Sequence, residues 1–460
     1  MFKLHVYYYK INNFSIMLKC IFLFVWILVE YSRLKGDYMT FALILFAGMY
    51  LCLLALPDYR YITALVTACI FVVTGILPVS KVFFAVDWNI ILMLSGIMIV
   101  VELFIESNMS MRMAEKLLKI VPNVKWAVVA LSLFAGVVSA FVDNVATVLM
   151  VAPIGLEVCR KLDTNPVPVI ISIAVSSNLQ GAATLVGDTT SILLGAAANM
   201  SFNDFFVFLG RPSICLPTEV GALMTIPILL YIFRKNSDPV HQEVTTVVED
   251  HVPSVLMVGV VLSLIFASQF PDKPAITNGL ICMAFAVIGC IYESIRQKST
   301  AFLVEIFKEK FDYQTLLLLA GLFIVIAGIT EAGVIDAIAE AFVKVGGNSL
   351  FGMYTLIVFA SVVISAFVDN IPYVATMLPV VSGIASSMGV EPYLLYFGLL
   401  IGATLGGNLT PVGASANITG IGILQKEGYE VSTKDFMRIG VPFTLVAVLS
   451  GYIVNWIFWS

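Results

Sequence analysis

The stretch Ser139-Ala-Phe-Val-Asp-Asn144 lies inside an apolar segment, and the same residues return as Ser365-Ala-Phe-Val-Asp-Asn370, 226 positions later (365 − 139). An aspartate at the centre of a membrane helix costs roughly 2.5 to 3.5 kcal/mol on insertion scales. A chain that keeps an aspartate twice in one apolar context is expected to use it. We therefore look for function at the repeated Asp-Asn pair.

The composition indicates a membrane protein. Hydrophobic residues make up 60% of the 460 positions and charged residues only 12%, which is far from the balance of a soluble domain. We predict an all-α polytopic membrane protein. The net charge of −5 gives no reason to expect a nucleic-acid partner, and no HExxH-type metal motif or ATP-binding loop is present. We expect no enzyme activity, no catalytic residues and no cofactor.

Apolar runs of about 20 residues can cross a bilayer. Such runs lie near 39–57, 62–79, 89–106, 213–233, 253–270, 275–292, 314–330 and 439–458. Two further segments, 166–198 and 392–425, are long but interrupted by glycine and polar residues, and they predict broken helices. The segments 124–160 and 350–388 each contain an apolar arm, then Asp-Asn, then a short second arm, and they predict re-entrant hairpins.

The two halves of the chain align, which indicates an internal repeat. At the offset of 226, Pro153 aligns with Pro379, Gly181 with Gly407, Thr184 with Thr410 and Gly187 with Gly413; at 225, Asp87 aligns with Asp312, Gly96 with Gly321 and Glu106 with Glu331. If the hairpins do not cross, five crossings separate the equivalent helices, so the repeats are inverted, as in many transporters. We predict repeat 1 over 39–233, a cytoplasmic linker over 234–252 and repeat 2 over 253–460, with five spans in each repeat.

The distribution of loop charge supports this topology. It places sixteen lysines and arginines on one side and only Lys81, Arg211, Lys273 and Lys344 on the other. The positive-inside rule makes the crowded side cytoplasmic. The first hairpin is then expected to enter from the cytoplasm and the second from outside.

Residues 1–38 do not fit the repeat. Their apolar run, about 14–31, could be a signal anchor or an extra helix, although Arg33 and Lys35 would then lie on the side that is poor in positive charge. Alternatively, translation starts at Met39, because residues 35–39 can be encoded as a bacterial ribosome-binding site followed by a start codon. Both interpretations remain open.

The hairpin tips are the first part of the predicted site. Unwound backbone near the middle of the membrane offers carbonyls to a cation and N–H groups to an anion. Asp143 and Asp369 add negative charge there, and Asn144 and Asn370 add neutral ligands. This set suits a sodium ion or an exchangeable proton. Each aspartate can also cap the second arm, since Asp is a favoured N-cap.

The broken helices are the second part, and each is expected to face a hairpin tip. Their candidate ion- or substrate-binding residues are Asn178, Thr184, Asp188, Thr189, Thr190, Asn408, Thr410, Ser415 and Asn417. Asp188 has Ala414 as its repeat partner, so this carboxylate is present in one half only. It is the natural candidate for the group that couples protons to ion movement. The alternative is that Asp188 only caps the helix starting at Thr189.

These residues resemble the ion transporter superfamily that contains arsenite permeases, NhaD-type sodium/proton antiporters, the P protein and citrate-transporter-like permeases. The likeness extends from Met39 over nearly the whole chain. Residues 367–372 and 407–417 look most like the P protein, whereas Gly187-Asp-Thr-Thr190 looks like the NhaD pattern. Dicarboxylate symporters of the superfamily have Ser-Asn-Thr at both tips, and Asp143-Asn-Val145 departs from that pattern. The resemblance implies inverted repeats, a homodimer and a place in the prokaryotic plasma membrane.

The sequence thus predicts a secondary active ion transporter, an antiporter driven by sodium or protons that works by alternating access. Its expected partners are the lipid bilayer, a small inorganic ion or anion, and a second copy of the chain. Export of arsenite or another oxyanion and sodium-coupled anion symport are the alternatives within transport. A channel also stays open. An intramembrane aspartyl protease is disfavoured, because protease aspartates lie on ordinary spans and need no inverted partner segments.

Overall fold

The structure is a computed structural model that describes residues 38–161, 164–240, 246–248, 250–270, 272–347 and 349–460. Residues 1–37, which contain nearly all of the segment that does not fit the repeat, lie outside the described residues. The fold is helical apart from one pair of two-residue strands. In the described part of the chain, seven helices are long and apolar enough to cross a membrane, and several shorter apolar helices accompany them.

The chain divides into two compact units, and the first contains residues up to Val86 together with Leu317–Ile338. Its helices are α2 (Tyr38–Ala55), η1 (Pro57–Tyr59), α3 (Arg60–Val73), α4 (Val79–Ala85) and most of α15 (Tyr313–Glu331). Small residues bring α3 and α15 close together, since a Cβ at Gly321 would lie 2.9 Å from the carbonyl carbon of Ala64. An ion pair of 2.5 Å between Lys81 and Glu331 joins the region of α4 to the end of α15.

The second unit, Asp87–Leu316 with Ala339–Ser460, contains both Asp-Asn repeats. Its first part comprises α5 (Trp88–Glu106), α6 (Met109–Leu118), α7 (Val124–Ser139), α8 (Asn144–Lys161), α9 (Val167–Gly181), α10 (Thr189–Ala197), η2 (Asn203–Phe205), β1 (Val207–Phe208), β2 (Arg211–Pro212), α11 (Cys215–Ile232), α12 (Val252–Ala267), α13 (Thr277–Gln297), α14 (Ala301–Glu305) and η3 (Ile306–Lys310). After α16 (Val334–Gly346) follow α17 (Leu350–Ser365), α18 (Asn370–Met388), α19 (Tyr393–Gly406), η4 (Gly407–Leu409), α20 (Ser415–Lys426) and α21 (Thr433–Trp459).

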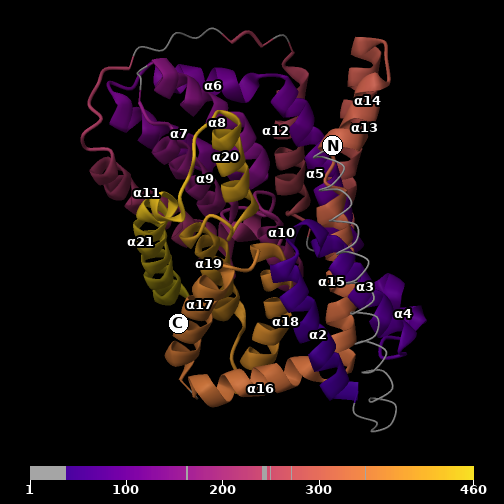
Figure 1. The fold of residues 1–460 in the computed structure, drawn as a ribbon. Coiled ribbons are helices and arrows are strands. Elements are labelled where there is room, and N and C mark those ends of the chain that lie inside the picture. Colours follow the sequence, from indigo (N-terminus) through magenta and orange to yellow (C-terminus); the bar gives the residue numbers. More distant parts are fainter. Residues whose placement is uncertain (1–37, 162–163, 241–245, 249, 271, 348) are drawn as a thin grey trace, which may run out of the picture. The chain divides into compact units, whose positions relative to one another are not determined.

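The two segments predicted as hairpins are helix pairs that turn at the repeated hexapeptide. The first pair is α7 and α8, and the second is α17 and α18 (Figure 1). The prediction of short second arms was wrong: α8 has 18 residues against 16 in α7, and α18 has 19 against 16 in α17. Pro153 and Pro379 lie inside these arms without ending them, because neighbouring helices can compensate for the lost backbone bond in a membrane helix.

The two segments predicted as broken helices are broken where the glycines are. α9 ends at Gly181 and α10 begins at Thr189, while α19 and η4 end before α20 begins at Ser415. Glycine is required at these breaks, since a Cβ at Gly187 would lie 2.6 Å from the carbonyl oxygens of Gly181 and Ser139. The same crowding surrounds Gly413.

The second half of each broken helix packs against the other repeat. α20 packs on α8 and α9 of the first repeat, and α10 packs on α18 and α19 of the second (Figure 1). The centre of unit 2 is therefore built jointly by both halves of the chain. The packing brings the starts of α8, α10, α18 and α20 into one region.

The segments 109–121 and 298–310 have cationic and apolar residues at helical spacing, which predicts interfacial helices. The segment 109–121 forms α6, and the segment 298–310 forms α14 and η3. Helix α16 was not predicted; it begins 225 residues after α6 (334 − 109) and is its counterpart in the second repeat. The first part of the linker pairs with the start of α7, where the backbone carbonyl of Asp238 accepts a hydrogen bond of 3.1 Å from the N–H of Val124.

Candidate functional site

The hairpin aspartates cap the second arms. The Asp143 carboxylate accepts hydrogen bonds from the N–H groups of Val145 (2.9 Å) and Ala146 (3.3 Å). The Asp369 carboxylate accepts one from the N–H of Ile371 (3.1 Å) and a second from the hydroxyl of Ser415 (3.2 Å). Capping and a role in binding are compatible, because each carboxylate has lone pairs beyond those used by the caps.

Four asparagines form a buried amide cluster next to the first hairpin tip. The side chain of Asn178 accepts from Asn144 (2.9 Å) and donates to the amide oxygens of Asn408 (2.7 Å) and Asn417 (3.0 Å). Asn178, Asn408 and Asn417 are fully buried. Two of these residues come from each repeat. The cluster is therefore complete only because α20 packs against the first repeat.

A carboxylate cluster lies at the second hairpin tip. Asp188, which is 3% exposed, accepts hydrogen bonds from the hydroxyl of Thr190 (3.0 Å) and the amide of Asn370 (3.3 Å). The hydroxyls of Thr190 and Thr404 lie 3.3 Å apart. Asp188 occupies the N-cap position of α10, but its side chain accepts no capping hydrogen bond, so the structure does not support the alternative that this residue only caps the helix. No lysine, arginine or histidine among the described residues forms an ion pair with it.

Contacts around the tips recur at the sequence offset of 226. The Thr184 hydroxyl donates to the carbonyl of Ala140, and the Thr410 hydroxyl donates to that of Ala366. Ser191 bonds the carbonyl of Gly181 at 3.2 Å, and Asn417 bonds that of Gly407 at 3.0 Å. The two halves thus build the same frame. The inversion of the repeats with respect to the membrane remains a prediction.

The chemistry inside that frame differs between the halves. When the repeats are aligned at the offset of 226, Asn178 corresponds to Thr404 and Asp188 corresponds to Ala414. As a result, amides gather at the first tip, and the carboxylate of Asp188, which forms no ion pair within the described residues, is at the second. Neutral oxygens suit a weakly bound cation, whereas a buried carboxylate can bind a cation or exchange a proton.

The structure places most predicted site residues in these two clusters. Asn144, Asn178, Asn408 and Asn417 belong to the amide cluster, and Asp188, Thr190 and Asn370 to the carboxylate cluster. Thr184 and Thr410 instead tie the broken helices to the hairpin turns, and Thr189 is buried at the start of α10. Asn144 and Asn370 belong to different clusters. The described residues contain no group of three or more His, Cys, Asp or Glu side chains that could hold a metal ion.

Three further polar residues near the hairpin tips were not predicted as site residues. Thr404 is the repeat counterpart of Asn178, so the offset could have revealed it. Ser177 donates to the backbone carbonyl of Asn144 at 3.0 Å. Gln180 donates at 3.0 Å to Glu219, a half-buried acid of α11 that has no repeat partner.

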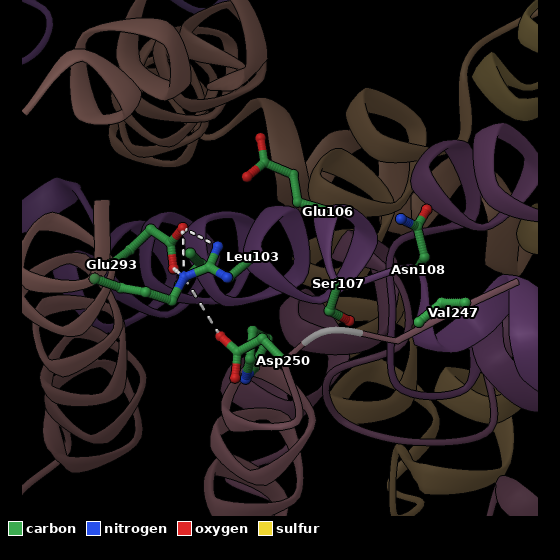
Figure 2. Close-up of a pocket in the computed structure, with 9 residues that line it drawn as sticks. Leu103, Glu106, Ser107, Asn108, Val247, Asp250 and Glu293 are labelled. Atoms are coloured by element: carbon green, nitrogen blue, oxygen red, sulfur yellow. Dashed lines mark hydrogen bonds and ion pairs between the residues drawn. The ribbon is translucent and has the colours of Figure 1, made fainter. Parts of the chain in front are cut away.

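A separate charged cluster lies around a cavity of about 220 Å³ where the linker meets α5 and α13. Arg296 bridges the buried carboxylate of Glu293 (2.5 Å) and that of Asp250 (3.7 Å). Figure 2 shows Glu106 apart from Glu293 and Asp250. Because Arg296 already supplies a cation, we interpret this cluster as an attachment of the linker to α13.

Comparison with known protein families gives one family match. The sequence model of CitMHS, described as "Citrate transporter", matches residues 41–402 and 300–459. An uncharacterized transporter of Mycobacterium tuberculosis H37Rv is 31% identical over 405 residues, which cover 86% of this chain and 92% of that protein. The human P protein is 25% identical over 521 residues, which cover 92% of this chain and 61% of the P protein.

Two solved transporter structures are similar to the fold. The YdaH transporter of Alcanivorax borkumensis matches with a TM-score of 0.58 and 11% identity, over 82% of this chain and 87% of that chain. MtrF of Neisseria gonorrhoeae, described as one of a class of antimetabolite efflux pumps, matches with a TM-score of 0.57 and 14% identity, over 82% of each chain. At such low identity these structures support the fold alone. They confirm the predicted all-helical membrane fold.

Proposed function

Because the chain belongs to the CitMHS family of transporters, we propose that it is a secondary active transporter that couples ion movement to a proton or sodium gradient, as an antiporter. The family and its relatives are transporters and not enzymes, so an aspartyl protease is set aside. The chain is an integral membrane protein, and its bacterial relatives favour the plasma membrane.

Asp188 is the observation that supports the coupling proposal most strongly. This carboxylate is buried, accepts from two neutral donors and has no ion-pair partner in the described part of the chain. A buried charge without a counterion is costly. The cost falls when the group takes up a proton or a cation, and this exchange is what a coupled transporter requires.

The amide cluster is the proposed neighbouring site for the transported ion. Its four side chains come from both repeats and from three helices and η4, so a movement of one helix changes several ligands together. Coupling then arises if the occupancy of one cluster changes the position of η4 and α19. Thr404 of the carboxylate cluster and Asn408 of the amide cluster are one helical turn apart on this segment.

An organic anion such as citrate is the second candidate cargo. The description of the family names citrate, and α8, α10, α18 and α20 all begin at the clusters. Helix N-termini carry partial positive charge and favour anions. A cation would use the carboxylates and amides, whereas an anion would use the N–H groups of these helix starts.

A proteoliposome assay tests the proposal. Sodium, lithium, citrate, arsenite and chloride gradients are imposed in turn, with a pH-sensitive dye trapped inside. We expect at least one gradient to drive proton movement or concentrative uptake. Flux that only follows the gradient of its own ion, without accumulation, would identify a channel and overturn the proposal.

The variant Asp188→Asn tests the role of the carboxylate. Asn keeps the size and the N-cap preference of Asp but cannot exchange a proton. We expect proton-linked flux, or its pH dependence, to be lost while some binding of the driving ion remains. Glu331→Gln, which alters an exposed acid paired with Lys81, is the control. Unchanged pH dependence in Asp188→Asn would leave this residue with a structural role only, as the hydrogen-bond partner of Thr190 and Asn370.

A further inference from the structure

A second cavity of unit 2, of about 820 Å³, lies at the ends of four helices and is distinct from the clusters at the hairpin tips. Its lining includes Val124 at the start of α7, Val167 at the start of α9, Ile232 at the end of α11 and Asp435 near the start of α21. Its volume is within the range of small-ligand pockets, which are typically about 300 to 1,000 Å³. The cavity is therefore large enough for a bound molecule.

Cationic side chains line the rim of this cavity. Arg234, Lys235 and Arg438 contribute to the lining and are exposed. Within the described ranges, none of the three forms an ion pair with an acidic side chain. The guanidinium of Arg234 lies 4.3 Å from the ring centre of Tyr231. Its charge is thus held at the rim and is not neutralised.

Two acids, Glu430 and Asp435, line the same cavity and reduce its net positive charge. Asp435 is already hydrogen-bonded at the start of α21. Its carboxylate accepts from the hydroxyl of Ser432 (2.6 Å), and its N–H donates to the same hydroxyl (3.1 Å). The rim still has three cations against two acids. One of the acids is already hydrogen-bonded within its own helix cap.

The helix ends add to the positive potential. Three of the four helices, α7, α9 and α21, present their N-termini to the cavity. A helix N-terminus carries a partial positive charge. The N–H of Val124 already bonds the Asp238 carbonyl and that of Asp435 the Ser432 hydroxyl, so these helix ends act through their charge. These helices have 16, 15 and 27 residues, so each is long enough for a full dipole effect. The cavity therefore favours an anion.

The inner wall of the cavity is apolar. It is formed by Ile228 and Phe233 of α11 and its C-cap, Val169 of α9, and Ile439 and Pro442 of α21. A small soluble anion would gain nothing from this wall. A molecule with an anionic head and a hydrocarbon tail would use both the rim and the wall.

We propose that this cavity binds an anionic phospholipid, with its phosphate at Arg234, Lys235 and Arg438 and its acyl chain along α9, α11 and α21. The loop charges assign these helix ends to the cytoplasmic side, where anionic lipids are found, and basic pockets between membrane helices on that side bind such head groups. The site is independent of the ion clusters. It predicts that lipid charge controls stability.

Thermal unfolding of the delipidated full chain in detergent, with added phosphatidylglycerol or phosphatidylcholine, tests this proposal. We expect phosphatidylglycerol to raise the melting temperature of the wild type more than phosphatidylcholine does. The double variant Arg234→Gln/Arg438→Gln should lose at least half of that difference. Native mass spectrometry should show fewer bound phosphatidylglycerol molecules on the double variant.

Lys434→Gln is the matched control. Lys434 is an exposed cation at the start of α21, the helix that contains Arg438, but it does not line the cavity. It should keep the wild-type response. If the double variant is unstable without lipid, Arg438→Gln alone provides the same comparison. Equal shifts with both lipids, or a full response in the arginine variants, would overturn the proposal. An equal shift with inorganic phosphate would assign the cavity to a soluble anion instead.

Discussion

At the scale of single residues, the aspartates of the two hairpins combine two roles that are normally separate. Asp143 and Asp369 each cap a helix through backbone N–H groups, and each places a carboxylate next to an asparagine of one cluster, Asn144 or Asn370. The cap explains why an acid is tolerated locally, because its hydrogen bonds offset part of the desolvation cost. It does not require a negative charge, since Asn caps as well as Asp.

Because capping does not need the negative charge, an Asp→Asn change tests the binding role alone. Asp143→Asn and Asp369→Asn should keep near-wild-type melting temperatures while coupled transport falls at least about tenfold, since loss of only about 1.4 kcal/mol of ion binding gives that factor. Transport is measured in proteoliposomes and stability by thermal unfolding. Asp87→Asn, which alters the cap of α5, should transport normally. Full flux in both hairpin variants would remove the repeated pair from the proposed site.

At the scale of helices, the two breaks depend on glycines that have no room for a side chain. A Cβ at Gly187 would meet carbonyl oxygens of Gly181 and Ser139 at 2.6 Å, and a Cβ at Gly413 would meet those of Gly407 and Ala366 at 2.5 and 2.9 Å. The hairpin turn and the broken helix are therefore in direct backbone contact. The hydrogen bonds of Thr184 and Thr410 to the same turns fix this arrangement.

The second prediction follows from that contact. Gly187→Ala and Gly413→Ala should each destabilise the protein by about 1 to 3 kcal/mol, the usual cost of forcing a group into a filled space. Gly422→Ala, in α20, has no atom within 4 Å of the added Cβ and should be neutral or slightly stabilising. Thermal unfolding in detergent measures all three. Equal melting temperatures for Gly187→Ala and Gly422→Ala would contradict the close contact.

The positions of the hairpin turns and helix breaks were predictable, because particular residues in the sequence identify them. The repeated hexapeptide locates both hairpin turns, and runs of glycine and polar residues locate both breaks. The exchange of α10 and α20 between repeats could not be predicted, because an offset identifies equivalent elements and not their packing partners. The amide cluster was missed as a unit for the same reason: Asn178 and Asn417 meet only through that exchange. The charge pattern did not reveal α16, the counterpart of α6, because α16 has a single cation, Lys344, whereas α6 has Arg112 and Lys116.

At the scale of the whole molecule, the sidedness of the chain rests on loop charge. The predicted topology puts Lys308 in the cytoplasm and Lys344 outside, and both side chains are exposed. Single cysteines at these positions, in a background without native thiols, should react with an impermeant reagent from opposite sides of the membrane. Labelling of both from the same side in intact cells would contradict the inverted repeats.

The exchange of half-helices also has a consequence for how the protein is made. Asn178 is synthesised more than two hundred residues before Asn408 and Asn417, its amide partners (408 − 178 = 230; 417 − 178 = 239). While the ribosome makes the second repeat, the first one lies in the bilayer with a polar core that lacks those partners. The first repeat therefore cannot complete its polar core on its own. The nascent chain must keep α9 accessible until α20 has been synthesised, so the amide cluster closes only after most of the chain has been made.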